Sequence, residues 1–290
     1  MSMRVFVTGG TGVLGRRAVS QLVAAGHGVT AVARTPHKAD DLRGRGANPI
    51  SVDLFDRAAL EPVLRGHDAV AHLATNIPTG ASAPLRWKWR TNDRLRRDAA
   101  QTIAAAAIAC GVERLIQESI TFPYVDCGET CIDEVTERRY FWGNRSTVDA
   151  ERAAAHVTSA GGTGVVLRFA MFAAPDSAHV QTSTAAARRG FFGVFGRPDA
   201  YISFVHADDA AAAVVAALDV RAGTYNVAEA EPARRAEHRQ HLAAAVGRAT
   251  LRSVPRVVER AGGAGADSLA RSHRISSALL QRESSWRPAR

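Results

Sequence analysis

The start of the chain constrains the fold most, because it joins a short apolar run to three regularly spaced glycines. Residues 5–8 read Val-Phe-Val-Thr, and Gly9, Gly12 and Gly15 follow directly. Residues 18–25 then place apolar side chains at helical spacing. This order predicts a β-strand, a tight turn and an amphipathic α-helix.

Each glycine has a physical reason to stand where it does. Gly9 lets the chain turn sharply off the strand, Gly12 lets the backbone approach a phosphate, and Gly15 lets the helix pack against the sheet. A dinucleotide pyrophosphate would then lie at the helix N-terminus, where free N–H groups and the helix dipole favour negative charge. We therefore expect a dinucleotide site whose loop contacts are Gly9, Thr11, Gly12, Val13, Leu14 and Gly15.

Short apolar runs alternate with helical patterns as far as residue 170. Strands are expected near residues 4–8, 29–33, 49–53, 69–73, 113–117 and 163–168. This alternation predicts an α/β fold, a Rossmann-type doubly wound parallel sheet. We expect residues 1–170 to form the dinucleotide-binding domain, with residues 200–227 returning to it. Residues 171–199 and 228–290 are expected to form a smaller region that covers the substrate.

The G-x-x-G-x-x-G spacing resembles the short-chain dehydrogenase/reductase superfamily, in particular its extended and atypical branch of epimerase/dehydratase-like proteins. Further segments follow in the family's order, at residues 52–54, 70–74, 111–116, 164–169, 204–209 and 223–227. The resemblance implies an adenine contact at Asp53, with Leu54 beside it. It also implies a turn under the cofactor formed by Leu73, Ala74 and Thr75.

The end of the second predicted strand bears on the choice of cofactor. NAD-preferring proteins of this type need an acidic residue there, and this chain has Ala33. Arg34 follows at once and Lys38 is close, and an arginine binds a 2′-phosphate through charge-assisted hydrogen bonds. We expect NADP(H) rather than NAD(H), held by Arg34 and Lys38. The alternative is that Arg34 is an ordinary solvated loop residue.

The expected catalytic pair is missing. The superfamily usually carries a tyrosine and, four residues later on the same helix face, a lysine that lowers the tyrosine pKa. Matching on Glu151 places Gly143 and Thr147 at these two positions. Hydroxyl groups elsewhere are therefore the candidates for proton transfer, with packed aromatic or structural roles as their alternatives: Ser119, Thr121, Tyr124 and Tyr140.

Three further ionisable residues lie at predicted strand ends. Glu118 either acts as an acid or base, or pairs with an arginine. His72 lies in an apolar context, which favours a hydrogen-bonded core histidine. Arg168 either pairs with a carboxylate or caps its strand. His206, followed by Asp208 and Asp209, is expected to open a helix.

These features together predict an NADP(H)-dependent oxidoreductase that reduces a carbonyl or similar unsaturated group of a small molecule. Reduction needs only a proton donor, whereas alcohol oxidation needs a base, which a tyrosine without a neighbouring cation is not. Aromatic residues in loops, such as Trp87 and Phe191, suit an apolar or aromatic substrate, although they could equally be core or interface. The alternatives are a non-redox lyase, dehydratase or isomerase, and an NADP-sensing regulatory protein.

Composition argues against several other classes. The net charge is +9, but the arginines are scattered rather than gathered in one stripe, so we expect no nucleic-acid partner. No apolar run reaches membrane-spanning length and no leader is evident, so we expect no membrane and a cytoplasmic location. Cys110, Cys127 and Cys131 are expected to be reduced thiols, without a metal site. A homodimer is left open.

Overall fold

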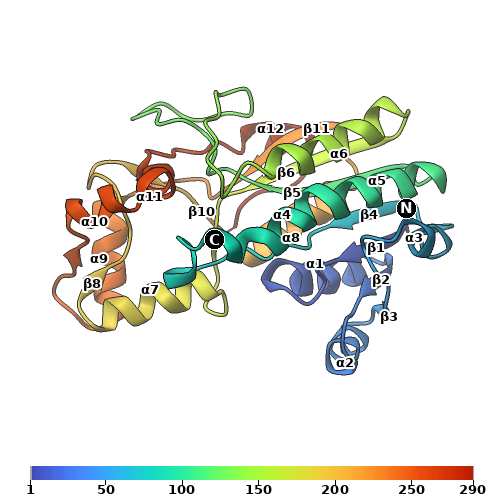
Figure 1. Cartoon of the computed structure of the whole chain (residues 1–290), viewed down its shortest axis with the longest axis horizontal. Coiled ribbons are helices and arrows are strands. Elements are labelled where there is room, and N and C mark those ends of the chain that lie inside the picture. The colour runs from blue at the N-terminus through green and yellow to red at the C-terminus, as the bar shows by residue number, and fades with distance from the viewer. Residues whose placement is uncertain (1, 290) are drawn as a thin grey trace.

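A parallel sheet runs through the protein, and the computed structural model describes residues 2–289 (Figure 1). Within these residues the sheet has seven strands in the order β11-β6-β5-β4-β1-β2-β3. All neighbours pair in parallel. The bounds are β1 Arg4–Thr8, β2 Gly28–Val32, β3 Asn48–Ile50, β4 Ala69–His72, β5 Arg114–Ile120, β6 Thr163–Phe169 and β11 Gly223–Val227. The predicted Rossmann-type fold is confirmed, and the chain changes direction between β1 and β4.

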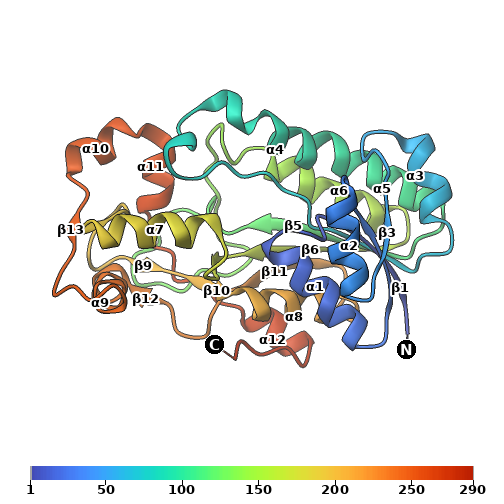
Figure 2. The same cartoon turned by 90° about the horizontal axis from the view of Figure 1, so that it is seen from below.

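Helices cover both faces of this sheet (Figures 1 and 2). One face carries α1 (Val13–Ala24) and α8 (Ala207–Ala216), which pack against each other. The other carries α3 (Arg57–Leu64), α5 (Ala100–Ala109) and α6 (Thr147–Ser159). The remaining helices of this part are α2 (Pro36–Gly44), the short turns η1 (Gly80–Ser82) and η2 (Arg86–Trp89), α4 (Arg90–Arg94) and the π-helical turn η3 (Leu95–Ala99).

Strand β1 shows why the sheet is buried on both sides. Val5 and Val7 pack into the core beneath α1 and α8, whereas Phe6 packs beneath α3 and α5. All three side chains are completely buried. Successive side chains of a strand point to opposite faces, so a strand covered by helices on both faces reads as a continuous apolar run.

The covering region lies beyond the carboxyl ends of the strands, and Figure 2 shows its helices grouped there. Its helices are α7 (Ala178–Arg188), α9 (Arg235–Ala245), α10 (Arg256–Ala261) and α11 (Gly263–Ala270). Three short strand pairs accompany them. These are β7 (Met171–Ala173) with β10 (Phe204–His206), β9 (Tyr201–Ile202) with β12 (Ala233–Arg234), and β8 (Phe191–Phe192) with β13 (Arg252–Ser253).

The C-terminal segment belongs to the main core rather than to the covering region. Helix α12 (Ala278–Glu283) packs on β11, and Leu280 and Trp286 join the core beneath α8. The Trp286 indole N–H donates to the Asp209 carbonyl at 2.8 Å. Residues 200–227, which are predicted to return to the dinucleotide-binding domain, contain α8 and β11. The domain boundaries themselves remain a prediction.

Among the described residues, no helix is both long and apolar enough to span a bilayer.

His72 links the ends of β4 and β1 inside the core. Its Nδ1 lies 2.6 Å from the Thr8 hydroxyl, and its Nε2 lies 3.3 Å from the Leu95 carbonyl. Burial lowers the pKa of His72 to about 4, so the ring is neutral at physiological pH. His72 is therefore the hydrogen-bonded core histidine that the sequence predicts.

This lowered pKa predicts how stability depends on pH. Because the unfolded histidine takes up a proton near pH 6.5 and the folded one only near pH 4, the stabilisation is complete above pH 6.5 and is lost as pH decreases toward 4. One such histidine contributes a slope of up to about 1.4 kcal/mol per pH unit. Urea unfolding between pH 4.5 and 7 should show a shallower dependence in His72→Gln than in the wild type.

The exposed His37 supplies the control for this experiment. His37→Gln should keep the wild-type slope, because its side chain has no burial to lose on unfolding. Equal slopes for His72→Gln and the wild type would contradict the prediction.

Candidate functional site

The turn after β1 is pressed against the end of β4. Gly9 has a φ of 71°, in the left-handed region that favours glycine. A Cβ at Gly9 would lie 2.7 Å from the Leu73 carbonyl carbon and oxygen and 2.7 Å from the Ala74 nitrogen. Two segments predicted separately to contact the dinucleotide therefore meet in one place. A side chain at position 9 would force β1 and β4 apart.

The same turn holds the start of α1. A Cβ at Gly15 would lie 2.0 Å from the Gly9 carbonyl oxygen, so only glycine fits. The Gly12 N–H donates to that oxygen at 2.9 Å, while a Cβ at Gly12 would meet only the same oxygen, at 3.3 Å. No side chain caps α1 and no acidic residue lies in its first turn. Its N-terminal N–H groups are thus suited to a pyrophosphate.

Two arginines on α1 form ion pairs with aspartates that come later in the chain. Arg17 Nη2 lies 3.0 Å from Asp176, and Arg17 Nε lies 3.0 Å from Asp208. Arg16 also pairs with Asp176.

The residues predicted to bind the adenosine half lie around the ends of β2 and β3. Arg34 is exposed and Lys38 is half-buried, and neither forms an ion pair in the part of the chain that the structure describes. Ala33 before them is buried. Asp53 is exposed, with one carboxylate oxygen accepting from the Phe55 N–H at 2.9 Å, and Leu54 packs into the core beneath α3. The Arg34 side chain, without an ion pair among the described residues, therefore lies just after β2, at the position where the sequence predicts a contact to a 2′-phosphate.

Ser119 and Tyr124 belong to one buried polar network. The Ser119 hydroxyl donates to Glu151 Oε1 at 2.8 Å. Arg168 donates to both oxygens of Glu151 at 2.8 Å and to the Tyr124 hydroxyl at 2.7 Å. The Tyr124 hydroxyl in turn donates to Asn226 Oδ1 at 2.8 Å. Arg168 thus pairs with a carboxylate, as one alternative of the sequence analysis proposed, and ties β5, β6, β11 and α6 together.

The other two candidate hydroxyls are not part of this network. Thr121 is buried, and its hydroxyl makes no hydrogen bond within residues 2–289. Tyr140 is half-buried, with the Arg138 guanidinium 5.6 Å from its ring centre. Arg138 Nη1 also donates to Glu151 Oε2 at 2.5 Å, so Tyr140 borders the network without a hydrogen bond to it.

The protonation states follow from burial and neighbouring charge. Burial would raise the pKa of Glu151, but hydrogen bonds and charge from Arg168 and Arg138 lower it below its ordinary value. Burial raises the pKa of Tyr124, and also that of Tyr140 despite the charge of Arg138. Both phenols therefore stay protonated at neutral pH, able to donate a proton but not to act as bases.

Aromatic rings fill the place of the family's tyrosine. A Cβ at Gly143 would lie 2.6 Å from Phe141 Cε2 and 3.4 Å from Trp89 Cζ2. Trp142 packs edge-on against both rings, with centroids 5.5 and 5.9 Å away. Thr147, at the lysine position, is buried and donates to the Asn144 carbonyl at 2.7 Å. Neither position can supply the usual chemistry.

Sequence reasoning missed the partner of Glu118. Arg96 Nη2 donates to both oxygens of Glu118, at 2.9 and 3.1 Å, and both side chains are buried. Glu118 therefore pairs with an arginine, which was one of its two alternatives. Arg96 falls on the apolar spacing of its helix with Ala99, Ala100 and Ile103, and this position on the buried face was the available signal.

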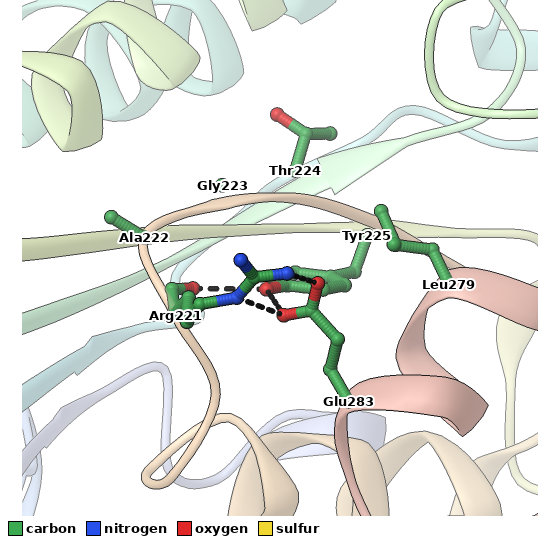
Figure 3. A pocket seen from close by; sticks show the side chains of 7 residues that line it. All are labelled: Arg221, Ala222, Gly223, Thr224, Tyr225, Leu279 and Glu283. Atoms are coloured by element: carbon green, nitrogen blue, oxygen red, sulfur yellow. Dashed lines mark hydrogen bonds and ion pairs between the residues drawn. The ribbon is translucent and has the colours of Figure 1, made fainter.

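A cavity at the opposite, amino end of β11 is not a candidate site. Figure 3 shows that Arg221, Tyr225 and Glu283, which line it, interact with one another. The Tyr225 hydroxyl donates to Glu283 Oε2 at 2.6 Å, and Arg221 pairs with the same carboxylate. The amino ends of the strands also lie away from the glycine turn.

No group of three or more potential metal ligands occurs among the described residues.

Comparison with known proteins agrees with this geometry. Residues 9–220 match the model of an NAD(P)H-binding family. A 3-diazoavenalumate denitrifying reductase of a Streptomyces species is 30% identical over 266 residues, which cover 87% of this chain and 84% of that protein. A dihydroquinoline-1-oxide ketoreductase of Stigmatella aurantiaca is 33% identical over 170 residues, 57% of this chain and 49% of its own length.

Solved structures show the same fold. A UDP-glucose 4-epimerase from Stenotrophomonas maltophila, with bound NAD, is 21% identical with a TM-score of 0.80, over 99% of this chain and 94% of its own. A dTDP-glucose 4,6-dehydratase from Streptomyces venezuelae, also with NAD, is 19% identical with a TM-score of 0.79, over 99% and 92%.

The glycine turn predicts a sharp contrast between two substitutions. Gly15→Ala places a methyl group 2.0 Å from the Gly9 oxygen, so the turn must move. We expect the free energy of unfolding to decrease by about 1–3 kcal/mol. We also expect nicotinamide dinucleotide affinity, measured by fluorescence titration, to decrease at least about tenfold, or 1.4 kcal/mol.

Gly44→Ala is the matched control. Gly44 ends α2 in open space, with nothing within 4 Å of the place that an added methyl group would take, so stability should rise slightly or stay the same. Nucleotide affinity should not change. Wild-type affinity in Gly15→Ala would show that this turn does not hold the dinucleotide.

Proposed function

Because this chain belongs to the NAD(P)H-binding family within the short-chain dehydrogenase/reductase superfamily, we propose that it is an NADPH-dependent reductase. Its family and its reductase relatives make it an NAD(P)-dependent oxidoreductase or epimerase-like enzyme. The proposal adds the phosphorylated cofactor, the direction of reaction and the class of acceptor. The acceptor is a carbonyl or similar unsaturated group of a small, apolar or aromatic molecule.

The observation that carries the proposal is the backbone cradle made by Gly9, Gly12 and Gly15 against the end of β4. No side chain blocks the start of α1, and the family's cofactor fits this arrangement. The bound dinucleotide would supply a hydride. The chain itself would bind the pyrophosphate at the N-terminus of α1, hold the adenosine half at Arg34, and orient the acceptor near the ends of β4 and β5.

The preference for NADPH rests on the end of β2. Arg34 is exposed and without an ion pair among the described residues, and no acidic side chain replaces the buried Ala33. A guanidinium without an ion pair can form two parallel, charge-assisted hydrogen bonds to a 2′-phosphate. Lys38, half-buried in the first turn of α2, adds a second positive charge to the same strand end.

Arg34→Ala tests this preference. One charge-assisted contact contributes about 1.5–3 kcal/mol, so the NADPH dissociation constant should increase about ten- to a hundredfold while that for NADH stays the same. Arg43→Ala, which breaks a surface ion pair with Asp40 on α2, removes the same charge and should change neither constant. Equal wild-type affinities for both cofactors, unaffected by Arg34→Ala, would rule out the preference.

The proton needed for carbonyl reduction must come from a group that is not already committed. The Ser119 and Tyr124 hydroxyls donate within the Glu151 network, whereas the Tyr140 phenol is half-buried, protonated and without a hydrogen bond among the described residues. We assign proton donation to Tyr140, with the Thr121 hydroxyl positioning the acceptor oxygen. Without a base, the reverse oxidation at neutral pH should be slow.

Tyr140→Phe should lower kcat for carbonyl acceptors by about 10²–10⁴ while leaving the NADPH dissociation constant unchanged. Tyr225→Phe removes a phenol at the amino end of the sheet and should leave kcat unchanged. Steady-state assays that follow NADPH consumption across a carbonyl panel make the comparison. Equal loss in both variants, or none in Tyr140→Phe, would mean that Tyr140 is not the donor.

A second candidate function follows from the missing tyrosine and lysine together with the name of the diazo-reducing relative. Hydride transfer to an aryl diazonium group forms a C–H bond and breaks the C–N bond, with N₂ leaving. This reaction requires no proton, so a site without an acid suffices. Under this alternative, release of N₂ from a diazonium acceptor would be unaffected by Tyr140→Phe.

The assembly as a homodimer and a cytoplasmic location remain expectations from the sequence.

A further inference from the structure

An arginine lies beside the proposed proton donor, Tyr140. The guanidinium carbon of Arg138 lies 5.6 Å from the centre of the Tyr140 ring. The Arg138 side chain is 32% exposed, so water screens its charge only in part. Thr147, at the position of the family's lysine, is uncharged, and its hydroxyl donates to a backbone carbonyl. The cation beside this phenol therefore comes from a residue that precedes the tyrosine.

Both the backbone and the side chain of Arg138 are held in place. Its backbone pairs antiparallel with Tyr124, and hydrogen bonds at 3.1 and 2.7 Å join the residues on either side of this pair. Its Nη1 donates to Glu151 Oε2 at 2.5 Å. Glu151 in turn is fixed by Arg168, which donates to both of its oxygens at 2.8 Å. The guanidinium is thus held beside the phenol ring.

The charges around Tyr140 do not cancel. The charged residues that act on its phenol are Arg138, Glu151, Arg168 and Arg152. Arg138 and Arg168 share the single carboxylate of Glu151, whereas Arg152 has an ion pair of its own on α6, at 3.6 Å. Two guanidinium groups and one carboxylate leave an excess of one positive charge beside the phenol. Such an excess favours the phenolate over the phenol.

We propose that Arg138 is a positioning residue for Tyr140, which holds the phenol ring in place and stabilises the phenolate that proton donation leaves behind. This inference rests on the proposed reductase function. As the carbonyl carbon accepts the hydride, the carbonyl oxygen takes the proton of Tyr140, and the resulting phenolate is then reprotonated by water. The negative charge that forms on the phenol oxygen is balanced by the excess positive charge of Arg138 and Arg168.

Burial opposes this stabilisation. Burial raises the pKa of Tyr140 and Glu151 raises it further, while Arg138 and the other two arginines lower it. Loss of Arg138 would leave the Glu151 carboxylate paired with Arg168 alone, and the excess positive charge would disappear. The phenol should then ionise at a higher pH and donate its proton less readily.

Arg138→Gln tests this role in the full chain. It should lower kcat for carbonyl acceptors at least about tenfold, with an unchanged NADPH dissociation constant, because a neighbouring charge changes a pKa by about 1 or more. Arg138→Lys should recover most of the loss, because the contact to Glu151 uses a single nitrogen. In a Tyr140→Phe background, Arg138→Gln should have no further effect on kcat.

Arg145→Gln is the matched control. Arg145 is exposed, forms no ion pair within residues 2–289 and lies in the same segment, so this variant also loses one positive charge. It should keep the wild-type kcat. An equal loss of kcat in Arg145→Gln, an equal effect of Arg138→Gln in the Tyr140→Phe background, or no recovery in Arg138→Lys overturns the proposal.

Titration of the phenol separates this proposal from the proposed function. The ultraviolet absorbance of tyrosinate is followed over the alkaline pH range in which circular dichroism shows an intact fold, and the curve for Tyr140→Phe is subtracted. The onset of Tyr140 ionisation should move to higher pH by about 1 in Arg138→Gln. An unchanged onset overturns the role of Arg138 even if carbonyls are reduced. A shifted onset without turnover of any carbonyl rejects the reductase function and retains the action of Arg138 on the phenol.

Discussion

The contact on which the rest of the site depends is the one between the Gly9 turn and the end of β4. A Cβ on Gly9 would lie 2.7 Å from Leu73 and Ala74, and a Cβ on Gly15 would lie 2.0 Å from the Gly9 carbonyl oxygen. Close-packed backbone of this kind leaves the N–H groups of α1 uncovered. The proposed cofactor surface is thus made of backbone atoms that no side chain covers.

Near that surface, two carboxylates are held in ion pairs with arginines. Glu151 is held by Arg168 and Arg138, and Glu118 by Arg96. Hydrogen bonds and charge from the arginines keep the pKa of Glu151 below its ordinary value, and the ion pairs hold both carboxylates in position, which rigidifies the strand ends. Under the proposed function, proton transfer depends on hydroxyls that lie beside these networks.

The sequence was informative wherever a local pattern has a local cause. The glycine spacing, the apolar run at residues 5–7 and the alternation of strands and helices each predicted an element that the structure contains. It was less informative about partners far apart in the chain. Arg96 and Glu118, or Arg168 and Tyr124, are 22 and 44 residues apart, and only the sheet order brings them together. The same holds for Trp286, whose place beneath α8 depends on the C-terminal return.

The ion pairs of Arg17 bear on which part of the covering region can move relative to α1. Arg17 lies on α1, the helix that would hold the pyrophosphate, and it forms ion pairs with both Asp176 and Asp208. These ion pairs connect residues 171–176 to the dinucleotide-binding domain, although these residues follow β6 and belong to the covering region. A hinge that opens the substrate side without breaking these ion pairs would lie beyond Asp176, at the start of α7. Opening and closing would then leave the cofactor cradle undisturbed.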